Sequence, residues 1–502
     1  MESGSAFGLS HSVRHIQTHM SHVFLTGSRA YKFRKSVDLG FCSFLTLAQR
    51  QDDVARELRL NRRLAPQVYL GICTFDGRQF GPLITNIPSS WPETELALVM
   101  VELDPQTNAK FLLEAGTLQG DHLAHAAKQL AEFHRQNRLN SRDSRTKNWE
   151  MAHYQPALDN PIALKDYLKD RRGDADELTN RIQAFQMDHP NWFTNRLQHG
   201  RAVDGHGDLH LEHLWFPQPA HPIWIDCLEF RDDFRLMDTV YDIGFLAMDL
   251  VYRGRPDFAD HFLQCYSLAS LDYDSFKGLR LAMSYRAAVR AKVAAMACAD
   301  PEIERHQREA ALESAHRHLD LALHVLRPVQ TAPIIATCGA VGTGKSTLAK
   351  AIAKELGGIR IASDVLRKRL AGVEPHHHLA SQFYDWESTV NVYKRMKDYA
   401  SSVAQAGRIA ILDATYASEK LRAFLPPEAI LVWLEADRDE LQKRLTYRAT
   451  DTSTESDAGP ELLEQSLAYF EPPTQWPNTI RIDTGHSDWL EQAIDALRQH
   501  IT

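Results

Sequence analysis

The strongest restriction on the fold comes from eight residues, GAVGTGKS, at positions 339–346. They match G-x-x-x-x-G-K-[S/T], the phosphate-binding P-loop, which needs a strand before it and a helix after it. Residues 334–338 form a short apolar run, and Leu348, Ile352 and Leu356 form a helical stripe that ends at Gly357. Backbone N–H groups of such a loop and the N-terminus of its helix face one phosphate. The sequence therefore predicts binding of ATP or GTP in the last third of the chain.

Two side chains of this loop have expected tasks. Lys345 can reach the β- and γ-phosphates, and the Ser346 hydroxyl can coordinate magnesium. The alternative is a glycine-rich turn that binds nothing, but strand, loop and helix are all present. The predicted nucleotide-binding residues of the loop are Gly339, Gly342, Thr343, Gly344, Lys345, Ser346 and Thr347.

Length and composition set broad limits. The 502 residues, 44% of them hydrophobic, are enough for two or three domains with sizeable cores. A net charge of −8 argues against a general nucleic-acid binder, which would usually be strongly basic. The six cysteines include no C-x-x-C pair, and no segment reads as a signal peptide or a membrane span. We expect a cytoplasmic protein with reduced thiols and no membrane association.

A proline-containing segment, residues 327–333, divides the chain. It follows a helical pattern at about 300–326 and precedes the P-loop strand, and its two prolines stop the helix. The sequence therefore predicts two domains, 1–328 and 329–502.

The second of these domains alternates apolar strands with helical patterns. That order predicts an α/β domain with a parallel sheet, helices on both faces, and ligands beyond the carboxyl ends of the strands. The candidate strands are 334–338, 359–362, 408–412, 429–434 and 479–482.

Asp413 directly follows one of these strands, where a P-loop protein places the acid that orients magnesium. The next residue is Ala414, whereas motor ATPases generally have a glutamate there to activate water. The pattern therefore favours phosphoryl transfer to a bound acceptor over hydrolysis. A structural cap at the strand end is the alternative for Asp413.

The segment SDVLR places Asp364 and Arg367 three residues apart, on one face of a helix start. The Asp can accept a proton from an attacking hydroxyl, and the Arg can hold the acceptor or the transferring phosphoryl group. The alternative is an N-cap by Ser363 or Asp364 beside a solvated arginine.

Two further arginines, Arg444 and Arg448, lie four residues apart before a polar stretch at 450–459. This arrangement predicts a lid that closes on ATP and neutralises charge in the transition state. Exposed helix arginines with no such role are the alternative.

Taken together, these motifs resemble those of P-loop kinases similar to gluconate kinase and to polynucleotide 5′-kinase domains. The resemblance rests on GKSTLA, SDVLRK, LDAT and RLTYR, with Ser456-Asp457-Ala458 after them, and it covers 333–502. It implies that Asp364 is the general base and Arg367 positions the acceptor, whose identity it leaves open.

The first 330 residues contain a second set of phosphotransfer residues. The segment DGHGDLH at 204–210 is followed by an apolar strand at 222–225 and by Asp226. A kinase needs an Asp to take the hydroxyl proton and another about twenty residues later to hold magnesium, roles that Asp208 and Asp226 fit. Two short strands joined by residues 26–29 present Lys32, and a helix at 47–64 carries Glu57 to pair with it.

These four residues, in this order, resemble the aminoglycoside phosphotransferase-like branch of the protein-kinase fold, over about residues 10–325. The whole chain is thus similar to fusions of such a domain with a P-loop kinase of the AAA ATPase group. The resemblance implies an α+β protein-kinase-like domain followed by an α/β P-loop kinase domain with a parallel sheet.

Two departures from the family pattern bear on the first site. The family motif H-G-D-x-x-x-x-N ends in an Asn that gives an oxygen to magnesium, but His213 stands there. Imidazole suits softer metals, so the second metal position is altered, lost or served by another group such as Glu212. No G-x-G-x-x-G covers the phosphates, and Lys35 competes with Lys32 for the lysine role.

The leading hypothesis is an ATP-dependent kinase with two phosphotransferase modules that act on hydroxyl groups of small molecules. Its cofactors would be ATP and Mg²⁺, with Mn²⁺ as an alternative in the first module; Asp226, His213, Ser346 and Asp413 are the predicted metal ligands. Two alternatives remain open: a non-catalytic first module that senses nucleotide and gates the second, and a kinase for nucleic-acid 5′-hydroxyls. The sequence fixes neither the acceptors nor the oligomeric state.

Overall fold

The structure is a computed structural model that describes residues 1, 4–10, 12–38, 40, 42–301, 303–373, 377–448 and 459–501. The chain forms two compact units. The N-terminal unit comprises Met1–Arg253 and Tyr285–Leu319, and the C-terminal unit comprises Gly254–Ser284 and Asp320–Thr502. Each unit is described by itself.

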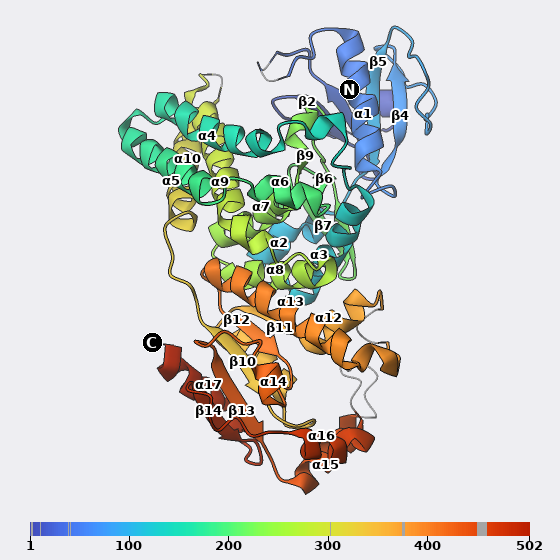
Figure 1. The fold of residues 1–502 in the computed structure, drawn as a ribbon. Coiled ribbons are helices and arrows are strands. Elements are labelled where there is room, and N and C mark those ends of the chain that lie inside the picture. Colours follow the sequence, from blue (N-terminus) through green and yellow to red (C-terminus); the bar gives the residue numbers. More distant parts are fainter. Residues whose placement is uncertain are drawn as a thin grey trace. The chain divides into compact units, whose positions relative to one another are not determined.

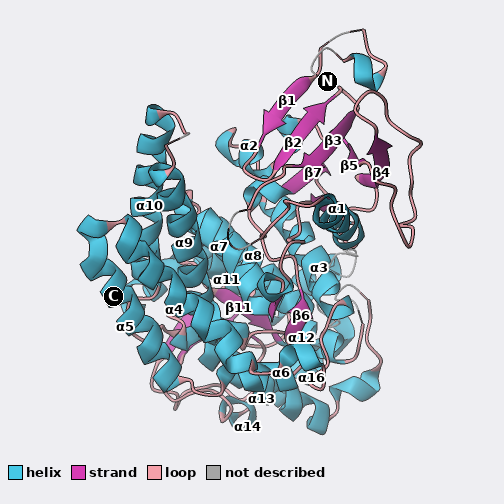
Figure 2. Cartoon of the chain, turned by 90° about the horizontal axis from the view of Figure 1, so that it is seen from above, coloured by secondary structure: helices cyan, strands magenta, loops and turns pink. Residues whose placement is uncertain are grey.

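The N-terminal unit begins with a five-stranded antiparallel sheet in the order β1-β2-β3-β5-β4 (Figure 2). Helix α1 (Leu47–Asn61) packs against it and starts at a capping box formed by Thr46 and Gln49. Val54 and Leu58 of α1 pack with Ile72 and Leu98 of the sheet in one apolar cluster. The strands are β1 (Arg14–Gln17), β2 (Ser21–Leu25), β3 (Arg29–Arg34), β4 (Tyr69–Phe75) and β5 (Glu95–Val101).

The rest of the N-terminal unit is mainly helical, with two small antiparallel sheets, β6-β9 and β7-β8. These sheets flank the DGHGDLH segment. Their strands are β6 (Ala202–Asp204), β7 (Leu214–Gln218), β8 (His221–Trp224) and β9 (Leu236–Asp238). The helices are α2 (Ala109–Glu114), α3 (Gly120–Gln136), α4 (Trp149–Tyr167), α5 (Arg172–Asp188), α6 (Trp192–Gln198) and α7 (Thr239–Tyr252), together with parts of α9 (Ser275–Ala299) and α10 (Arg305–Val325).

The C-terminal unit contains a five-stranded parallel sheet in the order β11-β12-β10-β13-β14 (Figure 1). Its strands confirm the predicted set to within two residues at each end: β10 (Ile334–Cys338), β11 (Ile359–Ala362), β12 (Ala410–Asp413), β13 (Ile430–Glu435) and β14 (Thr479–Asp483). The main helices are α11 (Lys345–Glu355), α12 (Ser363–Leu370), α13 (Trp386–Gln405), α15 (Arg438–Arg448), α16 (Leu463–Tyr469) and α17 (Trp489–Ile501). Apolar residues of the sheet, α11 and α17 form one core.

The C-terminal unit also includes helix α8 (Pro256–Ser270), which packs on the edge strand β11. Gln264 accepts a hydrogen bond from the backbone N–H of Arg360 at 3.2 Å, and Asp260 pairs with Arg408 at 2.8 Å. The rings of Tyr273 and Tyr399 stack nearby. The division into units therefore differs from the single cut predicted between 328 and 329, because residues 254–284 cover a strand edge of the C-terminal unit.

None of the helices in the described ranges combines the length and the apolar character needed to span a bilayer. All six cysteines are free, as expected for reduced thiols.

Candidate functional site

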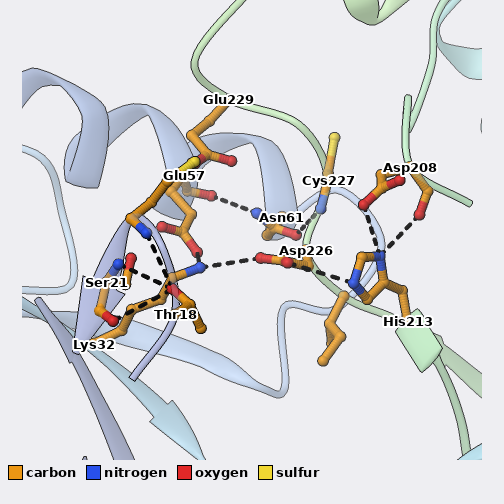
Figure 3. A network of polar contacts seen from close by, with 12 residues as sticks. Thr18, Ser21, Lys32, Glu57, Asn61, Asp208, His213, Asp226, Cys227 and Glu229 are labelled. Carbon is orange, nitrogen blue, oxygen red and sulfur yellow. Dashed lines mark hydrogen bonds and ion pairs between the residues drawn. The ribbon is translucent and has the colours of Figure 1, made fainter. Parts of the chain in front are cut away.

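Lys32 of β3 lies between two carboxylates in the N-terminal unit (Figure 3). Its Nζ donates to Glu57 Oε1 at 2.8 Å and to Asp226 Oδ1 at 3.0 Å. Burial by itself would lower the pKa of Lys32, but Asp226 and Glu57 outweigh it and raise the pKa above the usual value. The structure therefore brings together three of the four residues predicted for this site, and Lys32 rather than Lys35 forms the pair.

A second cation, the buried Arg34, also pairs with Glu57. Its guanidinium donates to Glu57 Oε2 at 2.9 Å and also pairs with Asp53 and Glu229. Arg34 and all three carboxylates are buried. The two oxygens of Glu57 are thus divided between Lys32 and Arg34, a contact that the sequence reasoning missed.

Asp242 of α7 holds the loop that carries Asp208 by hydrogen bonds to its backbone. Asp242 accepts hydrogen bonds from the backbone N–H of His206 at 2.8 Å and of Gly207 at 2.9 Å, and its Oδ2 lies 3.1 Å from His134 Nε2. Burial alone would raise the pKa of Asp242, but the bond from His134 and these donors hold it well below its usual range. Asp242 was also missed by the sequence reasoning.

Asp208, the predicted base, lies beside two histidines. Its Oδ2 is 3.6 Å from His210 Nε2 and 3.4 Å from His213 Nδ1. Burial would raise the pKa of Asp208, but His210 and His213 hold it well below the usual range, so Asp208 is a carboxylate at neutral pH. Burial, followed by the charge of His210, lowers the pKa of His213.

Asp226 occupies the left-handed backbone region, with φ of 63°, two residues after the end of β8. Asp is one of the few residues other than Gly that adopt this conformation without a large penalty, and such residues cluster at functional sites. Its backbone N–H donates to the Tyr69 hydroxyl at 3.0 Å. Burial opposes ionisation, but Lys32 and His213 hold the pKa of Asp226 well below its usual range.

Glu212, the alternative oxygen ligand, is engaged elsewhere. Its Oε1 pairs with Lys110 Nζ at 2.7 Å and lies 3.6 Å from Arg253. The turn between β1 and β2 contains no glycine and is closed by Thr18, whose hydroxyl accepts from the Ser21 N–H at 3.0 Å. The first hairpin thus has a short side-chain-capped turn in place of a glycine-rich loop.

In the C-terminal unit, the P-loop joins β10 to α11 as predicted. Gly339 and Gly344 have φ of 146° and 91°, and a Cβ at Gly339 would lie 2.4 Å from the carbonyl oxygen of Leu434. Only glycine fits these conformations without strain. Thr343 and Lys345 both donate to the carbonyl of Ala340, at 2.9 and 2.6 Å, and Thr347 lies in the first turn of α11, which begins at Lys345.

Burial lowers the pKa of Lys345 to about 8, against the opposing effects of Asp413, Cys338 and Asp364. The Ser346 hydroxyl donates to Asp413 Oδ1 at 3.2 Å. The two predicted metal ligands of this unit are therefore adjacent, and both present the oxygen atoms that magnesium prefers.

Asp413 has an additional partner in Arg360 of β11. Nε and Nη2 of Arg360 both donate to Asp413 Oδ2, at 2.9 and 2.6 Å, and both side chains are buried. No local motif marks Arg360, and the sequence reasoning missed it.

The predicted acceptor residues follow β11 at the start of α12. Asp364 is close enough to act on the pKa of both Lys345 and Arg448. Arg367 is buried, donates to the carbonyl of Phe383 at 2.7 Å and lies under the Tyr384 ring.

Of the two predicted lid arginines, Arg444 is held by residues outside the P-loop. It pairs with Glu440 at 2.8 Å and donates to Thr484 Oγ1 at 2.9 Å. Arg448 at the end of α15 acts on the pKa of Lys345. The lid itself, 450–459, and the Ser456-Asp457-Ala458 motif lie outside the described residues except for Gly459.

Two family models match the sequence. Residues 38–279 match the "Phosphotransferase enzyme family" and residues 334–473 match an "AAA domain". Both resemblances inferred from the motifs are thereby confirmed.

Curated relatives match either most of the chain or about a third of it. Uncharacterized proteins of Mycobacterium tuberculosis and Mycobacterium bovis are 33% identical over 414 residues, which is 81% of this chain and 79% of theirs. A shikimate kinase of Bradyrhizobium diazoefficiens is 28% identical over 174 residues, 33% of this chain and 80% of that protein.

Two solved structures each resemble part of the chain. A gluconokinase from Sinorhizobium meliloti 1021 has 22% identity and a TM-score of 0.25, and covers 34% of this chain and 95% of its own. A choline kinase from Cryptosporidium parvum Iowa II has 11% identity and a TM-score of 0.39, and covers 63% of this chain and 90% of its own.

The match to the mycobacterial proteins extends over both units, and each unit has the family model of a phosphate-transferring or nucleotide-binding domain. The chain therefore belongs to the family of these mycobacterial proteins and is an ATP-dependent kinase, in which a protein-kinase-like phosphotransferase domain precedes a P-loop kinase domain.

Proposed function

We propose that each unit transfers the γ-phosphoryl group of ATP to a hydroxyl group of a small molecule. The observation that carries the proposal is the Lys32 contact with both Glu57 and Asp226, together with His213, which lies between Asp226 and the Asp208 carboxylate. A lysine paired with a helix glutamate and a metal-binding Asp is the arrangement that kinases need for phosphoryl transfer. Glu57 is buried, and Lys32 and Asp226 are partly buried beside it.

In the N-terminal unit, Lys32 binds the phosphates and Glu57 holds Lys32 in place. Asp208 takes the proton of the acceptor hydroxyl while the hydroxyl oxygen forms a bond to the γ-phosphorus. The bond between that phosphorus and the bridging oxygen breaks, and ADP leaves with the bridging oxygen. The depressed pKa of Asp208 keeps its carboxylate free of a proton of its own at neutral pH.

In the C-terminal unit, the P-loop backbone and Lys345 bind the β- and γ-phosphates. Asp364 is the base for the second acceptor, and Arg367 positions that acceptor. Arg448 neutralises charge on the transferring group, which its proximity to Lys345 supports. Ala414 stands where motor ATPases generally have the glutamate that activates water, which favours transfer over hydrolysis.

Metal ions would be held by Ser346 and Asp413 in one unit and by Asp226 and His213 in the other. A bound divalent ion supplies positive charge to the phosphate oxygens and orients them. The oxygen donors of the C-terminal unit fit Mg²⁺, whereas the N-terminal unit offers one carboxylate and one imidazole.

Small hydroxylated acceptors are favoured over nucleic acid because the chain carries a net charge of −8. A nucleic-acid kinase would need a basic groove, and its binding would weaken steeply with salt. Oligonucleotides that bind and become phosphorylated in a salt-dependent way would overturn this choice.

The experiment is a product screen with three variants of the full chain. Pools of sugars, nucleosides and amino alcohols are incubated with ATP, and phosphorylated products are identified by mass spectrometry. Asp208→Ala should remove one product and Lys345→Ala another, by about 10²–10⁴-fold in rate for loss of the base. The double variant should remove both.

Other outcomes separate the alternatives. Loss of both products from either single substitution would refute two independent modules. If Asp208→Ala changes no product but abolishes an effect of nucleotide on the C-terminal unit, the N-terminal unit is a regulator. No product from any pool would refute the proposal.

A further inference from the structure

The ring of His213 lies between the two carboxylates of the N-terminal site (Figure 3). A single 3-10 turn, Leu211–His213, carries it there. Nδ1 is 2.8 Å from the backbone carbonyl oxygen of Asp208, and Nε2 is 3.5 Å from Asp226 Oδ2. The two ring nitrogens therefore face different partners, and these partners determine where the proton sits.

The contact with the backbone fixes the tautomer. A carbonyl oxygen can only accept a hydrogen bond, so Nδ1 of His213 must carry the hydrogen. In the neutral ring, Nε2 then holds a lone pair, and this lone pair points at a carboxylate oxygen. Two electron-rich atoms that face each other in this way are stabilised by a cation between them.

The distance from Nε2 to the carboxylate fits such a cation. A charged imidazole bonded directly to a carboxylate would lie about 2.7–2.9 Å from it, whereas the separation here is 3.5 Å. Two atoms that each lie about 2.1 Å from one metal ion are about 3.0 Å apart at an octahedral angle and about 3.4 Å apart at a tetrahedral one. The observed separation is close to the tetrahedral value, so an ion can be accommodated between the two atoms.

The remaining contacts leave Asp226 Oδ2 and His213 Nε2 available to an ion. Asp226 gives its other oxygen, Oδ1, to Lys32, which leaves Oδ2 for the ion. The ring of His210 packs on that of His213, with centroids 4.1 Å apart. Phe245 packs in turn on His210. The orientation of Nε2 is set by the hydrogen bond of Nδ1 to the Asp208 carbonyl, which does not depend on His210.

A competing ligand set can be compared with this one. Asp208, His210 and His213 also place ligand atoms within 4.8 Å of one another. The contact between Asp208 and His213 in that set runs through Nδ1, at 3.4 Å. Because Nδ1 carries the hydrogen that the Asp208 carbonyl accepts, it has no lone pair to offer. The geometry favours Asp226 and His213 over this alternative.

We propose that His213 Nε2 and the Asp226 carboxylate bind one divalent first-row transition metal ion, and that the N-terminal unit selects such an ion over Mg²⁺. This inference rests on the proposed function only in that the ion lies at the kinase site. Magnesium takes oxygen ligands, whereas imidazole nitrogen strengthens binding of Mn²⁺ modestly and of Co²⁺ and Zn²⁺ more. The C-terminal unit, with two oxygen donors, has no such preference.

The test uses Mn²⁺ as a spectroscopic probe on the full-length Ser346→Ala protein, in which the P-loop metal ligand is removed. Mn²⁺ is added with a non-hydrolysable ATP analogue, and pulsed electron paramagnetic resonance reports nitrogen bonded to the ion. We expect ¹⁴N coupling from a directly bound imidazole. The coupling should vanish in Ser346→Ala/His213→Asn and persist in Ser346→Ala/His210→Asn, the matched control.

Competition between Mn²⁺ and Mg²⁺ measures the selectivity of the N-terminal site. Displacement of Mn²⁺ by Mg²⁺ should become about 10–100-fold easier in the His213→Asn background, the range seen when metal-site partners are changed. Absence of ¹⁴N coupling, or its loss with His210→Asn alone, overturns the proposal. Tighter Mn²⁺ binding after His213→Asn also overturns it, since that result means that a charged imidazole occupied the site.

These measurements are independent of turnover. If ¹⁴N coupling and the shift in competition are both found while no phosphorylated product forms, the metal site stands and the proposed function fails. Thermal unfolding of each variant shows whether the fold is kept, and the His210→Asn variant calibrates any loss of packing in the His210–His213 pair.

Discussion

Arg360 binds a single oxygen of Asp413 through two of its nitrogens, at 2.9 and 2.6 Å, while the other oxygen of Asp413 accepts from Ser346 at 3.2 Å. The arginine therefore decides which oxygen faces the P-loop. This is a positioning role, because Arg360 reaches the metal site only through the carboxylate.

Arg360→Met should weaken the Mg²⁺-dependent part of ATP binding by the C-terminal unit. Removing one partner of a buried ion pair costs about 3–5 kcal/mol in stability, and the freed carboxylate loses its fixed orientation. Titration of ATP with and without Mg²⁺ separates the two effects: binding with Mg²⁺ should fall far more than binding without it. Arg360→Lys, which keeps the charge, should lie between. The exposed Arg395→Met serves as control, and equal losses with and without Mg²⁺ would contradict the role.

From the lowered pKa of Lys345 we expect nucleotide binding to depend on pH. Its pKa of about 8 lies below the ordinary value of a lysine, so the ammonium loses its proton as the pH rises through 8. ATP affinity of the C-terminal unit should therefore decline above about pH 8, approaching tenfold per pH unit for one titrating group. Lys345→Arg, which stays protonated, should remove this decline, as measured by titration at pH 7, 8 and 9.

The same group contributes to stability with the opposite sign. The unfolded chain keeps its lysine protons to about pH 10.4, so between that pH and about 8 the unfolded state binds more protons than the folded one. The contribution of Lys345 to the free energy of unfolding therefore increases with pH across this window. Thermal unfolding of Lys345→Arg without nucleotide should lack that increase.

Arg34→Met should destabilise the N-terminal unit. Three buried carboxylates, Asp53, Glu57 and Glu229, would lose their shared cation, a change that costs about 3–5 kcal/mol. Denaturant unfolding measures the loss, with Arg59→Met on the exposed face of α1 as control. A stability change no larger than that of the control would show that the cluster contributes nothing.

Asp242→Ala should lower turnover of the N-terminal unit without raising the KM for ATP. Asp242 contacts the backbone that carries Asp208, so its loss shifts the base while Lys32 stays in place. A misplacement of about 1 Å can reduce the rate by about 10²-fold. The exposed Asp188→Ala is the control, and a raised KM at unchanged kcat would refute the positioning role.

Local motifs carried most of what the sequence predicted about the two sites. The P-loop and the segment around Asp208 are short, and their residue types follow from phosphate and proton chemistry. Lys32, Glu57 and Asp226 were predicted in order because a kinase site needs one residue of each kind. The parallel strands followed from alternation of apolar runs and helical patterns.

The residues that were missed act across long sequence separations. Arg34 meets Glu229, 195 positions away, and Arg360 meets Asp413, 53 positions away, so no local spacing connects them. Some signal existed: Arg34 lies two residues after Lys32 and shares its face of β3, and Arg360 interrupts the apolar strand IRIA. Asp242 stands in the apolar helix α7, where an acid calls for buried donors.

Helix α8, which packs on β11, restricts where this protein can be divided into fragments. A fragment cut at the proline segment would leave Gln264 and Asp260 behind, and the edge of the P-loop sheet would lose its cover together with the ring stacked on Tyr399. Bare strand edges invite pairing between molecules. The match to the phosphotransferase family ends at residue 279, inside the C-terminal unit, so neither that end nor the proline segment coincides with the division between the two units.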